Sequence, residues 1–130
     1  MGYFYMTIKR AQYDIEIYRG DTPVYKFQLV DVNEETGEEV PVDITEHTIK
    51  GQVRYTPDSI DTWFEFPIEK VEPENGVFKF VVTKDISEQL LPVGSIEPDT
   101  ATYDMQIELN NAVFTFLHGK FRVTRDITRV

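Results

Sequence analysis

The chain has 130 residues and a mass of 15.2 kDa, which is the usual size of one domain with one hydrophobic core. Hydrophobic residues make up 41% of it, including nine Phe, seven Tyr and one Trp, and this content excludes general disorder. The 13 Lys and Arg residues are outnumbered by 23 Asp and Glu residues, so the net charge is −10 and nucleic-acid binding is disfavoured. Because the sequence has no Cys, disulfide bonds, thiolate metal sites and Cys nucleophiles are excluded.

Residues 1–12 are predicted as an N-terminal arm that precedes a single β-sandwich domain at residues 13–130. The arm contains an apolar run without alternation, which we interpret as an assembly element; the alternative is that it pairs as an edge strand of its own domain. Its basic residues follow the apolar run, the reverse of a signal peptide, and no apolar stretch approaches the length of a membrane span. We therefore expect no membrane contact. The candidate interface residues of the arm are Tyr3, Phe4, Tyr5 and Met6.

Apolar and polar residues alternate with a period of two along most of the chain, which predicts β-strands. In the first of them, Tyr13, Ile15 and Ile17 share one face. The predicted strands cover residues 13–19, 22–32, 49–55, 63–69, 77–83, 103–109, 112–117 and 120–124. Such strands, separated by turn signals about every ten residues, are typical of an antiparallel sandwich, so the predicted fold class is all-β.

Polar residues, Gly and Asn mark the connections between these strands. Residues 33–39 predict a polar hairpin tip, and Asn75-Gly76 predicts a tight turn. Asn110-Asn111 joins the two halves of the clearest hairpin.

Residues 85–91 form the helical candidate, a connector of about two turns. Asp85 is predicted as its N-cap, Glu88 would complete a capping box, and Pro92 follows its end. A connector of this length leaves the all-β class unchanged.

The residues predict no catalytic, cofactor or metal site. His47 and His118 lie 71 positions apart, and neither has a carboxylate at ligand-like spacing. The acidic run within residues 33–39 does not fit a calcium loop, because Val42 stands where the bidentate Glu belongs. We interpret this run as a solvated hairpin tip.

The tripeptide Arg19-Gly20-Asp21 is the sequence that integrins bind. A match of three residues is expected by chance and carries little information. We interpret Arg19, Gly20, Asp21 and Thr22 as a structural turn, in which the side chains of Asp21 and Thr22 bond to nearby backbone amides.

An aromatic group at Tyr55, Trp63, Phe64 and Phe66 is typical of a core but could also line a binding face. Alternation places Trp63 on the face opposite Phe64 and Phe66. One of these faces would then be apolar at the surface, so Trp63 is a candidate interface residue.

Five fragments follow one another in a set order along residues 13–129. They are Arg19-Gly20-Asp21-Thr22, Pro41-Val42-Asp43-Ile44-Thr45, Gly76-Val77-Phe78-Lys79-Phe80, Tyr103-Asp104-Met105-Gln106-Ile107 and the segment from His118 to Arg129. Together they resemble small virion structural proteins of tailed bacteriophages and prophages, and the related N-terminal domain of phage baseplate upper proteins. Asp43 and Thr45 belong to a structural turn in that pattern, with Glu46 where a glycine or small residue usually follows.

The resemblance implies an immunoglobulin-like antiparallel β-sandwich that acts without catalysis as a decoration, neck, tail, baseplate or fibre-attachment subunit. Its implied partners are other virion proteins and further copies of itself, and its implied location is a phage particle made in the bacterial cytoplasm. The alternative is an extracellular carbohydrate-binding or adhesin-type sandwich, in which Tyr55 and Trp63 would form the sugar platform. An enzyme is the least favoured class.

Overall fold

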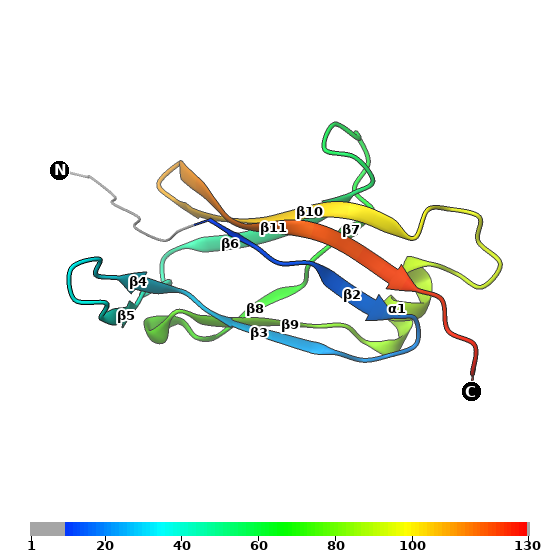
Figure 1. Cartoon of the computed structure of the whole chain (residues 1–130), viewed down its shortest axis with the longest axis horizontal. Helices are drawn as coiled ribbons and strands as arrows, with labels where there is room; N and C mark the ends of the chain where they lie inside the picture. Colours follow the sequence, from blue (N-terminus) through cyan, green and yellow to red (C-terminus); the bar gives the residue numbers. More distant parts are fainter. Residues whose placement is uncertain (1–9, 130) are drawn as a thin grey trace.

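The structure is a computed structural model that describes residues 10–129 of the chain. These residues form two β-sheets packed face to face, with a short helix at one end (Figure 1). The all-β sandwich predicted from the alternating pattern is confirmed.

Within the described residues, the larger sheet contains six strands. Its neighbours run in the order β1-β11-β10-β6-β7, and β2 also pairs with β11. The pairs of β11 with β1 and β2 are parallel, and the remaining pairs of this sheet are antiparallel. Its strands are β1 (Ala11–Gln12), β2 (Ile15–Tyr18), β6 (Thr48–Arg54), β7 (Phe64–Glu65), β10 (Thr100–Leu109) and β11 (Ala112–Thr124).

The smaller sheet is antiparallel, in the order β3-β9-β8, and the hairpin β4-β5 pairs separately from both sheets. The bounds of these strands are β3 (Val24–Gln28), β4 (Val30–Val32), β5 (Glu39–Pro41), β8 (Ile68–Glu72) and β9 (Val77–Val81). The helix α1 spans Lys84–Leu90, and a 3₁₀ turn, η1, spans Pro73–Asn75.

The strand order is that of an immunoglobulin-type sandwich. In that lettering β3, β9 and β8 are strands B, E and D, and β11, β10, β6 and β7 are strands G, F, C and C′. The β4-β5 hairpin lies between B and C in the sequence, and α1 lies between E and F.

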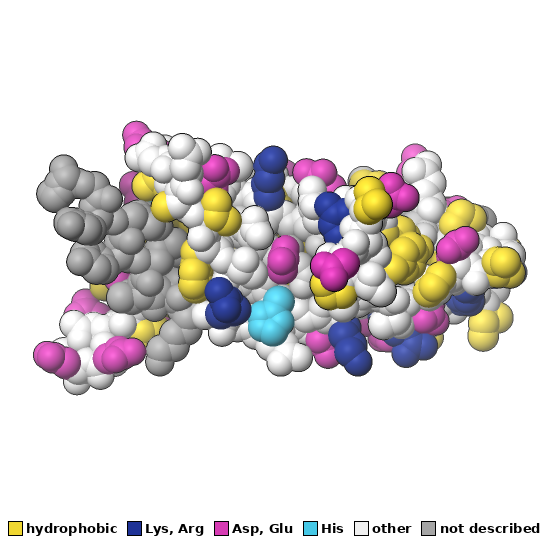
Figure 2. Space-filling model, turned by 90° about the horizontal axis from the view of Figure 1, so that it is seen from above, with side chains coloured by type: hydrophobic (Ala, Val, Ile, Leu, Met, Phe, Trp, Pro, Cys, Tyr) yellow, Lys and Arg dark blue, Asp and Glu magenta, His cyan; other side chains and the backbone are white. Residues whose placement is uncertain are grey.

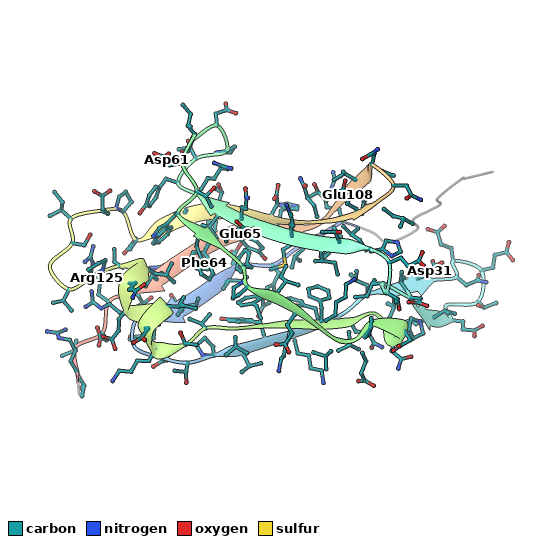
Figure 3. All side chains as sticks on the ribbon, turned by 180° about the vertical axis from the view of Figure 1, so that it is seen from behind. Asp31, Asp61, Phe64, Glu65, Glu108 and Arg125 are labelled. Carbon is teal, nitrogen blue, oxygen red and sulfur yellow. The ribbon has the colours of Figure 1, made fainter. Side chains whose placement is uncertain are left out.

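Aromatic rings fill the space between the sheets. Phe66 is buried, with its ring 4.8 Å from that of Phe80, 5.5 Å from Tyr103 and 5.8 Å from Phe121. Gly51 makes room for it, since a Cβ at Gly51 would lie 2.7 Å from the Phe66 ring. Figure 3 shows the side chains that fill this space between the layers. Burial of each large apolar side chain contributes about 2–3 kcal/mol.

The β10-β11 hairpin closes on Asn110 and Asn111, whose positive φ angles of 48° and 68° suit a type I′ turn. β11 is a single strand, whereas the sequence pattern predicts two strands, at residues 112–117 and 120–124. A bulge places Leu117 opposite Met105 and Thr115 opposite Gln106. Phe116 is the extra residue, and it and Leu117 are both buried.

The strand predicted at 13–19 is shorter than expected: β2 begins at Ile15, and Tyr13 and Asp14 lie in the gap between β1 and β2. Ile15 and Ile17 are buried as expected, but the Tyr13 side chain is 49% exposed and does not share their face. The carbonyl of Tyr13 lies so close to Gly119 that a Cβ there would approach its oxygen to 2.2 Å. The hydroxyl of Tyr103 donates to the same carbonyl, so this segment is fixed outside the ladder.

Two other predicted strands are each divided. The strand at 63–69 changes sheet at Phe66 and Pro67, consistent with the inability of Pro to donate a ladder hydrogen bond. The strand at 22–32 divides at Leu29, whose N–H donates to the carbonyl of Gly76.

The N-cap of α1 is Thr83 and not Asp85, because the Thr83 hydroxyl accepts from the N–H of Ile86. Glu88 contacts Lys84 at 3.8 Å across one turn instead of completing a capping box.

We predict that Gly119→Ala lowers the free energy of unfolding by about 2–3 kcal/mol, because the Tyr13 carbonyl must move away from β11. Urea denaturation at equilibrium measures the change. Gly37→Ala is the control, since its Cβ would meet nothing within 4 Å and only its positive φ opposes substitution. Equal losses in the two variants would contradict the steric explanation.

Candidate functional site

Arg19 joins three segments at the α1 end of the sandwich. Its guanidinium is buried, with Nε donating to Asp126 Oδ1 at 2.6 Å and Nη1 donating to the carbonyl of Leu91 at 2.9 Å. The bonds connect the end of β2 to the segment that follows α1 and to the segment that follows β11. A guanidinium held in this way is not presented to a receptor.

The rest of the turn is held by Ser87 of α1. The N–H of Gly20 donates to Ser87 Oγ at 2.7 Å, and Gly20 has a φ of +94°, which favours glycine. Asp21 and Thr22 are exposed, and within residues 10–129 neither side chain makes a hydrogen bond. The expectation that these two side chains fix the turn is therefore wrong, since Arg19 and Ser87 do so.

A groove of about 650 Å³ lies beside the hydrogen bonds of Arg19 and Ser87, between the turn, α1 and the C-terminal segment. We call it the end groove and define it by Tyr18, Lys84, Glu88, Val93 and Ile127. The side chains of Val93 and Ile127 are 61% and 92% exposed. Figure 2 shows hydrophobic side chains gathered toward this end of the molecule. The end groove therefore presents apolar area between charged groups, a composition typical of protein interfaces.

The other predicted turn, at Asp43 and Thr45, is an Asx turn. Asp43 Oδ1 accepts from the N–H of Thr45 at 2.9 Å and from its hydroxyl at 2.5 Å. These bonds, the hydroxyl first, lower the pKa of the Asp43 carboxyl below its ordinary value. Lys70 donates to the carbonyls of Thr45 and His47, which attaches the turn to β8.

Trp63 packs into the sandwich. Its Nε1 donates to the carbonyl of Leu90 at 2.8 Å, and its edge meets the buried ring of Phe121 at 5.5 Å. Phe64 and Phe66 also contact Phe121, so the prediction that Trp63 lies on the opposite face is wrong. Trp63 precedes the two-residue strand β7 and lies in a bend, where alternation does not apply. Tyr55 stacks on Trp63 with the ring centres 4.8 Å apart, so each ring covers one face of the other.

A second groove, of about 730 Å³, lies on the outer face of the larger sheet. We call it the cationic groove; Arg10, Arg54, His118 and Lys120 line it together with Asp104. Sequence reasoning missed it because its residues come from β6, β10, β11 and the segment before β1. The available signal was basic residues separated by an even number of positions: Lys50 and Arg54 in one strand, and His118, Lys120 and Arg122 in another.

His47 is buried beside the Asp43 turn, and His118 is exposed in the middle of β11. Desolvation lowers the pKa of His47 below its ordinary value. Among residues 10–129, no group of three or more metal-ligating side chains comes together. The candidate interface residues Tyr3, Phe4, Tyr5 and Met6 lie outside the described residues.

The sequence matches no protein-family model, and it matches no curated protein. Over the described part of the chain, no helix has the length and apolar character needed to cross a membrane.

We predict that stability falls in acid partly through Asp126. The hydrogen bond from Arg19 is the main cause that lowers the pKa of its carboxyl, so ionised Asp126 stabilises the folded state above the ordinary carboxyl pKa. That stabilisation is lost as the pH falls through and below this range. Asp126→Asn should therefore flatten the pH dependence of the free energy of unfolding between about pH 5 and pH 2. Asp21→Asn is the control, because the Asp21 side chain makes no hydrogen bond within residues 10–129. An equal change of slope in the two variants would contradict a role for the bond between Arg19 and Asp126.

We predict that Trp63→Phe lowers the free energy of unfolding by about 1–2 kcal/mol, because the carbonyl of Leu90 loses its donor and the stacked area shrinks. Tyr55→Phe keeps the stacked ring and should change stability little. Thermal and urea denaturation measure both variants, and an unchanged Trp63→Phe protein would contradict a packing role.

Proposed function

We propose that this chain is a non-enzymatic structural subunit of a tailed-bacteriophage virion and that it acts through protein–protein contacts. The sequence fragments described above support the virion class. The end groove is the proposed contact surface, because Val93 and Ile127 are exposed beside a turn that buried hydrogen bonds hold in place.

A contact on this surface would gain from hydrophobic burial. Ile96, on the same loop as Val93, is 96% exposed, and Tyr18 across the end groove is 51% exposed. Covering apolar surface contributes about 25 cal/mol for each Å² removed from water. Because Arg19, Ser87 and Asp126 hold the surrounding segments, little backbone ordering opposes the contact. A virion partner with an apolar projection fits this end.

The carbohydrate-binding alternative has less support. A sugar platform needs aromatic faces open to solvent, whereas Tyr55 and Trp63 stack on each other and Trp63 is hydrogen-bonded to Leu90. These contacts favour a structural role for the aromatic pair.

Particle association tests the proposed class. Antibodies against the chain should label one site on phage particles purified by density gradient from an induced culture of the strain that encodes it. Mass spectrometry of the same particles should find the chain at a fixed ratio to the major virion proteins. Its absence from purified particles, with the chain present elsewhere in the culture, would contradict the proposal.

We predict that Val93→Asp prevents incorporation of the chain into particles while the melting temperature changes little, because an exposed charge desolvated in the contact opposes docking. Val113→Asp is the matched control: this side chain is 55% exposed in β11, close to the Asn110-Asn111 turn. Equal incorporation of the two variants would show that the end groove is not the contact.

A further inference from the structure

The cationic groove carries positive charge on a chain whose net charge is −10. Arg54 donates to the carbonyls of Ser59 and Ile60 and to the amide oxygen of Gln52, all neutral groups. Over residues 10–129, neither Arg54 nor Lys120 has a carboxylate within ion-pair distance.

Arg10 adds a further positive charge to the same groove. It donates to the carbonyl of Thr115 and lies 5.3 Å from the centre of the Phe114 ring, so its described partners are also neutral. Asp104 is the carboxylate among the lining residues, and three cations against it leave an excess of positive charge. Figure 2 shows Lys and Arg side chains across the middle of this face.

The tip of the β4-β5 hairpin carries the opposite charge. We define the acidic tip by Glu35, Glu38 and Glu39, which are all exposed. Two hydrogen bonds fix its turn: the N–H of Asn33 donates to the carbonyl of Glu38, and the N–H of Glu35 donates to the side-chain oxygen Oδ1 of Asn33. The hairpin projects from the end of the sandwich opposite α1 (Figure 1).

These two features lie apart within one copy of the chain. The acidic tip projects beyond one end of the sandwich, on a hairpin that pairs with neither sheet. The cationic groove lies on the outer face of the larger sheet, between β6, β10 and β11. Figure 3 places Asp31, at the base of the acidic hairpin, at the end of the molecule opposite Arg125.

We propose that the acidic tip of one copy docks in the cationic groove of a second copy. The contact pairs two different surfaces, so it either repeats from copy to copy in a ring or filament or is made twice in a two-fold dimer. A second copy fits better than a foreign polyanion, because the remaining acidic surface repels a long uniform chain of phosphates, whereas the acidic tip offers its charge at one projecting point. This proposal goes beyond the virion assignment, and the isolated chain is enough to test it.

The electrostatic origin of the contact sets its dependence on salt. Exposed charges interact over a Debye length of about 30 Å in 0.01 M salt and about 3 Å in 1 M salt. Sedimentation velocity should therefore detect oligomers of the wild-type chain at low salt and monomers at high salt. A wild-type chain that stays monomeric in 0.01 M salt up to about 100 μM would overturn the proposal.

Charge reversal gives a test that separates this contact from general attraction. The tip-reversed variant carries Glu35→Lys, Glu38→Lys and Glu39→Lys, so the acidic tip becomes positive even with Glu34 unchanged. The groove-reversed variant carries Arg10→Glu and Lys120→Glu. Each variant alone has like charges on both surfaces, so its apparent association constant should fall by about tenfold or more. In an equimolar mixture, the positive tip of the tip-reversed variant can bind the negative groove of the groove-reversed variant. The unchanged negative tip of the groove-reversed variant can bind the unchanged positive groove of the tip-reversed variant. The mixture should therefore associate again.

The control Lys26→Glu with Lys79→Glu reverses two charges on the smaller sheet, where these residues are paired across β3 and β9. It changes the net charge as the groove-reversed variant does and should associate as the wild type does. Circular dichroism confirms that every variant is folded. A mixture that remains monomeric, or a tip-reversed variant that associates normally, would overturn the proposal. Binding of a heparin oligosaccharide without self-association would assign the groove to a foreign polyanion and also overturn it.

Discussion

The structure depends on the parallel pairing of the start of the described chain with its last strand. Ala11 lies opposite Leu117 and Ile15 lies opposite Phe121, which are contacts across more than 100 residues. Parallel pairing joins strands from distant parts of the chain, so it carries a large loop-closure cost that the packing of the sandwich must offset. Gly119 gives the first strand space to approach, and Arg19 attaches the turn after it to Asp126. The end groove lies beside that attachment, so its geometry follows from closure of the fold.

Local patterns in the sequence predicted the elements of the fold but not how long-range contacts divide them. The period of two and the Asn110-Asn111 turn identified the strands and the main hairpin, because both signals arise from neighbouring residues. The chain passes from the larger to the smaller sheet at Phe66 and Pro67. The alternating pattern continues through this point, so it cannot show that its two halves join different sheets. In the same way, Tyr13 leaves the buried face because Gly119, far along the chain, approaches its carbonyl. The cap of α1 is one of the few local errors: Thr83 and Asp85 are both good capping residues, and it is the Thr83 hydroxyl that accepts from the N–H of Ile86.

The site residues were predicted less well for the same reason. Asp43 and Thr45 form their turn with side chains two positions apart, so the sequence contains the whole interaction. The Arg19 turn depends on Asp126, 107 residues away, which no local pattern can indicate. The sequence pattern predicted a surface position for Trp63, because the alternation of the strand at 63–69 was applied to a residue that lies in a bend. The cationic groove was missed because its charges are brought together only by the pairing of β6, β10 and β11.

Charge is distributed unevenly over this acidic chain, and the distribution matters more than its total. A uniform charge of −10 would keep copies apart, whereas the acidic tip and the cationic groove place opposite signs at two fixed positions. The end groove lies at the opposite end of the sandwich from the acidic tip and presents exposed apolar side chains between charged groups. The two proposed contacts therefore use different surfaces and different forces: the first would weaken with salt, and the second would depend on apolar burial. A subunit with this division can join its neighbours through charge and still offer its α1 end to a different partner, because neither contact covers the residues that the other needs.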